Sequence, residues 1–299
     1  MPRPPALREG DGIAVVAPSS PFDRDRFERG VRALQEVGFE PRFGEGVHAR
    51  HAGYLAGPDT RRLDELLRAL RDRSALAIVL ARGGYGLLRI ATHIPQDLIT
   101  KPVVGYSDAT VLHELWWRAK TPSVHGPMCT QLGDDASALG RLREVLFGAV
   151  PEPLRWTPGI VRAGKAEGPL RGGNLAVLAS LCGTPLQPSF RGAIVLLEDL
   201  NEPAYRLDRL CTQLLLAGVF EGAAGFVVGD LSVEGEDNDG RDEAVGERLA
   251  TLGVPVVLGA PFGHDGRNQP VALGVPHSLD AGEGTLAQID PMLERRGAV

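Results

Sequence analysis

The feature that most constrains this chain's fold is an alternation of short apolar stretches with amphipathic ones through its first half. Apolar stretches typical of buried strands lie within 11–20, 74–86 and 102–108, and helical periodicity runs through 23–38 and 59–72 between them. Short strands that are apolar throughout, with helices between them, are typical of a parallel sheet that helices cover on both faces.

A stretch rich in Pro and Gly, 151–168, interrupts this alternation and shows no sustained period. We interpret it as a linker between an N-terminal α/β domain, 1–150, and a C-terminal α/β domain, 169–299. Strands and helices alternate again after it, as in GAIVLLED and YRLDRLCTQLLLAG. The predicted fold class is therefore α/β, with two domains.

The composition and charge pattern argue against several classes of protein. The formal net charge is −6, so we expect no basic surface for a nucleic-acid backbone. The arginine-rich run from Arg61 to Arg73 alternates with acidic residues and is expected to form a solvated helix face. We find neither a signal-peptide pattern nor an apolar run of roughly the 18 residues that a membrane span needs. Three widely spaced cysteines fit a reducing compartment, so we expect a cytoplasmic protein. From the charge and the apolar pattern together, we expect no nucleic-acid or membrane partner.

Three reactive residues follow apolar strands directly: Ser107 after PVVGY, Glu198 after GAIVLL and His264 after VPVVLGAPFG. In open α/β sheets ligands gather at the carboxyl ends of the strands. A serine, a carboxylate and a histidine are the parts of a hydrolytic triad, in which histidine takes the serine proton and the carboxylate orients the imidazole. The order Ser, Glu, His also occurs in α/β-hydrolases.

Ser107 has two interpretations at this point. GYSDA differs from the nucleophile elbow G-x-S-x-G only in Ala109, which is still small. Serine is also among the best helix N-caps, and a helix is expected to begin here. Both roles are compatible, because the start of a helix offers N–H donors to an oxyanion.

A second signal is the glycine-rich turn ARGGYGLLR, which contains Gly83, Gly84 and Gly86. It lacks the spacing of a dinucleotide or P-loop motif. Donation of an N–H to an oxyanion beside Ser107 fits better than a phosphate cradle, and a plain turn is the remaining alternative.

Each helper residue has rivals. Asp199 and Glu202 compete with Glu198, and His125 competes with His264. We expect no metal site, because the histidines are scattered and no paired cysteine ligands occur. The acidic segment 234–243 lacks EF-hand spacing and is expected to be an exposed loop.

Eight motifs occur in this order: APSSP, YLAG, RGGYG, GYSDAT, HGPM, GGNLAVL, LLEDLNEPAYRLDRL and FGHD. Together they resemble the LD-carboxypeptidase family, which includes cytoplasmic muropeptide LD-carboxypeptidases and microcin C immunity peptidases. The resemblance covers nearly the whole chain. It implies that Ser107 is the nucleophile, Glu198 the carboxylate and His264 the base.

The same resemblance implies an oxyanion hole made by the backbone N–H groups of Asp108 and of Gly84, with Gly83 as the alternative to Gly84. It further implies an active site between the two domains, a homodimer, and chemistry without a metal or organic cofactor. The candidates for substrate contacts within these motifs are Arg82, Gly83, Tyr85, Asn174 and Arg206.

The activity implied is that of a serine carboxypeptidase, which removes a C-terminal D-alanine from a muropeptide tetrapeptide through an acyl-enzyme. A hydrolase of the same fold that cleaves a peptidyl or aminoacyl nucleotide antibiotic is the first alternative. A non-catalytic module that binds small peptides or nucleotides is the second.

Overall fold

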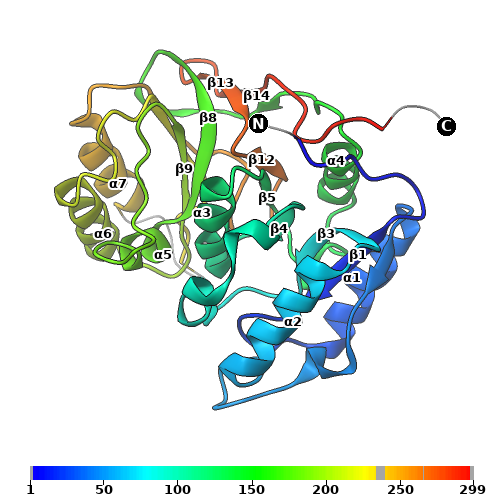
Figure 1. Cartoon of the computed structure of the whole chain (residues 1–299). Coiled ribbons are helices and arrows are strands. Elements are labelled where there is room, and N and C mark those ends of the chain that lie inside the picture. The colour runs from blue at the N-terminus through cyan, green and yellow to red at the C-terminus, as the bar shows by residue number, and fades with distance from the viewer. Residues whose placement is uncertain (1–2, 234–239, 265, 297–299) are drawn as a thin grey trace. The chain divides into compact units, whose positions relative to one another are not determined.

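The computed structural model describes residues 3–233, 240–264 and 266–296. They form two compact units (Figure 1). Unit 1 contains the chain up to Val150, residues 269–272 and the segment from Pro291 onward, and unit 2 contains residues 151–268 and 273–290. Each unit has its own sheet, so the predicted α/β class is confirmed.

Unit 1 is built on a six-stranded sheet in the order β12-β5-β4-β3-β1-β2. The pairs from β5 through β2 are parallel, as the apolar strands separated by helices predict. All residues of β1 and of β4 are buried, whereas β2 is the mostly exposed edge strand. The strands are β1 (Gly12–Val16), β2 (Glu40–Arg42), β3 (Ala75–Leu80), β4 (Val103–Gly105), β5 (Ser123–His125) and β12 (Val271–Leu273).

Helices α1 (Arg24–Glu36), α2 (Asp59–Arg71), α3 (Thr110–Arg118) and α4 (Ala136–Leu146) complete unit 1. Helix α2 packs against β1 and β3 (Figure 1). The prediction of a solvated face for this helix is wrong for two charged residues, because Arg62 is 0% exposed and Glu65 is 8% exposed. Two three-residue 3₁₀ turns, Leu87–Arg89 and Ala91–His93, follow Gly86 of the glycine-rich turn.

Unit 2 is built on an eight-stranded mixed sheet in the order β6-β14-β13-β8-β9-β10-β11-β7. Strands β8 to β11 are parallel, while β7 and β13 pair antiparallel with their neighbours. The strands are β6 (Leu154–Arg155), β7 (Gly159–Arg162), β8 (Lys165–Asn174), β9 (Ile194–Glu198), β10 (Gly225–Val228), β11 (Val256–Leu258), β13 (Pro276–Asp280) and β14 (Thr285–Gln288).

Helices α5 (Leu175–Ser180), α6 (Ala204–Leu216) and α7 (Arg241–Ala250) belong to unit 2. Apolar side chains from these helices and from the parallel strands form its core, among them Leu178, Leu197, Leu214 and Phe226. The stretch 151–168, expected as a linker, contains β6, β7 and the start of β8. Strand β6 and β7 lie at the two edges of the sheet, where the ladder tolerates Pro and Gly.

Candidate active site

Ser107 lies in a 3₁₀ turn, Ser107–Ala109, that connects β4 to α3. Its φ angle is 60°, a left-handed conformation that non-glycine residues rarely adopt. The N-cap position of α3 is Ala109, so Ser107 stands before the helix and is not its N-cap residue. A partly exposed serine at a strained strand-to-helix turn has the local geometry of a nucleophile elbow.

The glycine-rich turn lies against this serine. A Cβ added to Gly83 would be 3.0 Å from the Ser107 Cβ and 3.1 Å from its Oγ. Gly84 has a φ of 100°, and a Cβ there would come within 2.4 Å of the Ser20 Oγ. The glycine-rich turn can therefore lie this close to Ser107 and to Ser20 only because Gly83 and Gly84 carry no side chain.

Asp108, the residue after the serine, turns its carboxylate toward the same glycine-rich turn. Its Oδ2 accepts a hydrogen bond from the Leu87 N–H at 2.9 Å, and the side chain is 4% exposed. Burial raises the pKa of Asp108 to about 6, although hydrogen bonds from Ser19 and Leu87 and the charge of Arg62 oppose the rise. The Asp108 side chain therefore fastens the glycine-rich turn to the residue that follows Ser107.

In unit 2, Glu198 ends β9 and His264 follows β11, and the two side chains meet. The His264 Nδ1 lies 2.8 Å from the Glu198 Oε2, and their side chains are 16% and 0% exposed. Gly263 has a φ of 126°, and a Cβ there would be only 2.6 Å from the Asp230 Cβ. The His264 N–H donates to the Asp230 carboxylate at 3.2 Å, so a close backbone approach positions the histidine.

The pKa of His264 results from opposing effects. Burial lowers this pKa. The hydrogen bond and the charge of Glu198, together with the charges of Asp199 and Asp230, raise it by more than burial lowers it. The net shift is upward from the ordinary value of 6.5. An imidazole whose Nδ1 is paired with a buried carboxylate in this way is suited to act as a general base.

The rival carboxylates are engaged elsewhere. The Asp199 oxygens accept hydrogen bonds from the Asn174 side chain at 3.0 Å and from the backbone N–H groups of Ala176 and Leu200, each at 2.8 Å. Burial, and then the charge of Glu198, raise the pKa of Asp199 to about 7. Glu202 pairs with Arg206 at 2.8 Å.

The rival histidine, His125, lies in unit 1, and so does His113. His125 is completely buried, with its ring centroid 5.7 Å from that of Tyr106. His113 is a buried residue of α3. Its Nδ1 lies 2.8 Å from the Ser123 Oγ, and its Nε2 lies 3.0 Å from the Gly105 carbonyl oxygen. The ring that pairs with the Glu198 carboxylate is that of His264.

The remaining candidates serve several purposes. Arg82 is exposed and donates to the Pro21 carbonyl at 2.6 Å, and Tyr85 is 51% exposed with its ring near that of Tyr54. Asn174 caps α5 by accepting from the Val177 N–H, in addition to its bond to Asp199. Sequence reasoning missed two residues. Ser20, in APSSP, accepts a hydrogen bond from the Tyr85 N–H, and Asp230, at the strand end GFVVGD, accepts one from the His264 N–H.

No group of three or more His, Cys, Asp and Glu side chains in the described part of the chain is arranged to hold a metal ion. Residues 234–239 of the acidic segment lie outside the described residues. Among the helices that the structure describes, none combines the length and apolar character needed to cross a membrane.

Comparison with known proteins places this geometry in context. The family models for the LD-carboxypeptidase N-terminal and C-terminal domains match residues 13–126 and 167–279. A Bacillus subtilis protein named as a probable murein peptide carboxypeptidase is 34% identical, over 95% of this chain and 93% of its own. The murein tetrapeptide carboxypeptidase of Pseudomonas aeruginosa is 30% identical, over 86% and 89%.

Two solved structures show the same fold. The muramoyltetrapeptide carboxypeptidase of Oxalobacter formigenes superposes with a TM-score of 0.82 at 27% identity, over 94% of this chain and 99% of that chain. The microcin C7 self-immunity protein MccF superposes with a TM-score of 0.86 at 21% identity, over 98% and 99%.

Proposed function

The chain belongs to the LD-carboxypeptidase family, and from this premise we propose that it is a serine carboxypeptidase acting on muropeptides. It hydrolyses the bond between an L-configured centre and a C-terminal D-alanine of a tetrapeptide. The names of the relatives from Pseudomonas and Oxalobacter support this substrate class.

The observation that carries the proposal is the buried pair of Glu198 and His264, with 2.8 Å between Oε2 and Nδ1. In the proposed triad, Ser107 Oγ attacks the amide carbonyl while His264 Nε2 takes its proton. The imidazolium, stabilised by Glu198, then protonates the leaving amine, and the peptide remains as an ester on Ser107. Water then attacks this ester while His264 takes one of its protons. His264 gives that proton to Ser107 Oγ as the ester bond breaks, and the shortened peptide leaves.

The oxyanion of each tetrahedral intermediate needs donors that are already in place. We assign this role to the backbone N–H groups of Gly84 and Asp108. The contact between Gly83 and Ser107 supports the assignment, because it brings the glycine-rich turn alongside the nucleophile.

An exopeptidase must also hold the terminal carboxylate of its substrate, which charge-assisted hydrogen bonds accomplish best. Arg82 and Arg206 are the proposed donors, and Tyr85 and Asn174 are further candidates for substrate contacts. Arg206 would have to release Glu202 to serve in this way, since the two side chains are paired at 2.8 Å. A homodimer in the cytoplasm, working without a cofactor, completes the proposal.

The test is incubation of the purified protein with the muropeptide tetrapeptide and, separately, with an acyl-sulfamoyl adenosine, followed by mass spectrometry. We expect the tetrapeptide to lose one D-alanine. Cleavage of the nucleotide conjugate alone would establish the immunity-type alternative. Tight binding of either compound without any product would establish the non-catalytic module.

A further inference from the structure

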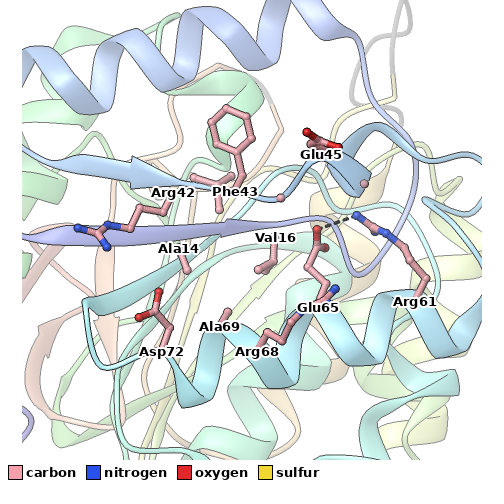
Figure 2. A pocket seen from close by; sticks show the side chains of 13 residues that line it. Ala14, Val16, Arg42, Phe43, Glu45, Arg61, Glu65, Arg68, Ala69 and Asp72 are labelled. Atoms are coloured by element: carbon pink, nitrogen blue, oxygen red, sulfur yellow. Dashed lines mark hydrogen bonds and ion pairs between the residues drawn. The ribbon is translucent and has the colours of Figure 1, made fainter.

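Helix α2 carries a row of charged side chains that fasten the backbone at the end of β1. Glu65 Oε2 accepts the Ala17 N–H at 2.7 Å, and Arg61 donates to the Ala17 and Ala56 carbonyl oxygens at 3.2 and 2.8 Å. Figure 2 shows this ion pair of Arg61 and Glu65 at the wall of a cavity of about 540 Å³. These charged side chains therefore fix the backbone where β1 leads into the turn APSSP, residues 17–21.

Arg62, the next residue on α2, is enclosed completely, with 0% of its side chain exposed. Its Nη1 donates to the carbonyl oxygens of Pro18 and Gly86, the latter at 2.9 Å, and its Nη2 pairs with the Asp59 carboxylate. The bonds made by the two Nη atoms offset part of the cost of burying this charge. One planar guanidinium thus joins the turn after β1 to the glycine-rich turn after β3.

Gly86 packs so closely against Arg62 that no side chain fits at this position. Gly86 has a φ of 135°, and an added Cβ would come within 2.6 Å of the Arg62 Nη1 and 2.9 Å of the Leu55 Cδ2. The turn is held at its other end by Ser20, whose N–H donates to the Gly83 carbonyl at 3.2 Å and whose Oγ accepts the Tyr85 N–H at 3.1 Å. Arg62 binds the backbone beside these contacts on both segments, because it donates to Pro18, two residues before Ser20, and to Gly86, the residue after Tyr85.

The same turn is tied to the nucleophile. Leu87, the residue after Gly86, donates its N–H to the Asp108 carboxylate, and Gly83 lies against Ser107. A displacement of Gly86 would therefore shift the N–H of Gly84 relative to the Ser107 Oγ.

We propose that Arg62 is a positioning residue for the reaction, which keeps the glycine-rich turn in the geometry that stabilises the oxyanion. This inference rests on the proposed function. Lysine cannot replace it, because a single ammonium lacks the planar fork that reaches two carbonyl groups and a carboxylate at once.

The test compares Arg62→Met and Arg62→Lys with the wild type in three measurements. These are kcat and KM on the tetrapeptide, the inhibition constant of a peptide boronic acid, and the rate at which a fluorophosphonate probe labels Ser107. The boronic acid forms a tetrahedral adduct whose oxygen needs the oxyanion donors, whereas the substrate ground state does not. We expect kcat, boronate affinity and labelling rate to fall by roughly 10- to 100-fold, with KM within about threefold, since loss of one oxyanion donor costs about 10²–10³.

Leu142→Ala in α4 is the matched control, because Leu142 is completely buried in unit 1 and its truncation lowers stability by leaving a cavity. It should lower Tm while leaving kcat and the labelling rate of the folded protein unchanged. Arg62→Lys keeps the positive charge, so it provides the same comparison if Arg62→Met does not fold.

The outcomes are distinguishable. Wild-type kcat, boronate affinity and labelling rate in both Arg62 variants, with only a lower Tm, would overturn the positioning role alone. A wild-type protein whose Ser107 does not react with the probe would overturn the proposed function and this inference with it.

Discussion

Replacing Glu198 with glutamine tests the proposed triad most directly, because it removes one charge from the pair that carries the proposal. The Glu198 Oε2 lies 2.8 Å from the His264 Nδ1 and is fully enclosed. A hydrogen bond to a charged group contributes about 1.5–3 kcal/mol. At 1.36 kcal/mol per tenfold change, loss of that bond to the imidazolium lowers kcat by about 10- to 160-fold.

A second effect increases this loss. Glutamine presents an amide N–H₂ group as readily as its oxygen, and an N–H facing Nδ1 would move the imidazole proton to Nε2. A histidine in that tautomer cannot accept the serine proton, and this defect costs about 10⁴ in serine proteases. We therefore expect Glu198→Gln to lower kcat by roughly 10²–10⁴, against roughly 10⁴–10⁶ for loss of the nucleophile.

The pH dependence provides the sharper measurement. His264 must be neutral to act as a base, so kcat/KM rises with pH through the pKa of His264 in the free enzyme. Because that pKa is raised above 6.5, the acid limb of the wild-type profile should lie above pH 6.5. In Glu198→Gln the burial effect remains while its largest opponent is gone, so the limb should move to lower pH.

Asp199→Asn is the matched control, because Asp199 is the adjacent carboxylate, and its oxygens face Asn174, Ala176 and Leu200. It should reduce kcat less, and it should move the acid limb less, since its charge is a smaller contributor to the pKa of His264. An unchanged acid limb in Glu198→Gln, or a larger loss of kcat in Asp199→Asn, would refute the assignment of Glu198.

Further expectations concern the other parts of the site. Ser107→Ala and His264→Ala should lower kcat by similar factors of roughly 10⁴–10⁶, because the two residues act as a unit; normal hydrolysis by either folded variant would remove it from the triad. A tetrapeptide with an amidated C-terminus should lose at least about tenfold in kcat/KM, because charge-assisted bonds contribute about 1.5–3 kcal/mol. The folded-state pKa of Asp108, about 6, exceeds its ordinary value of 3.8, so Asp108 binds more protons folded than unfolded. Stability should therefore fall by up to about 3 kcal/mol as pH rises from about 4 to 6, and Tm measured against pH should be flatter in Asp108→Asn.

The parts of the fold that sequence reasoning anticipated are those that local pattern determines. Apolar runs such as GAIVLLE predict buried parallel strands, and reactive residues just past them predict where Glu198 and His264 lie, because parallel strands end at one edge of the sheet. The positive φ of Ser107 was not predicted, since G-x-S describes a turn without specifying its dihedral angles.

The burial of Arg62 and Glu65 could not be predicted from the chain. Their spacing on α2 is also that of a solvated salt-bridged face. What distinguishes them is the position of backbone groups far along the chain, such as Ala17 N–H and the Gly86 carbonyl, which only the assembled sheet supplies. The strands within 151–168 were missed for a related reason, because short edge strands with Pro and Gly lack any alternation.

The division of unit 1 between the two ends of the chain has a consequence for synthesis on the ribosome. Residues 269–272 include the start of β12 at the edge of the sheet. The Pro270 carbonyl oxygen accepts a hydrogen bond from the Arg141 side chain, and the Glu294 carbonyl oxygen accepts one from the Ala6 N–H. When residues up to Val150 have emerged, β5 still lacks this neighbour and presents an unpaired edge. At roughly 5–20 residues per second, the following half of the chain takes on the order of 10–30 s to appear. During that interval the sheet that leads to Ser107 is open to chaperones and to pairing with other nascent chains.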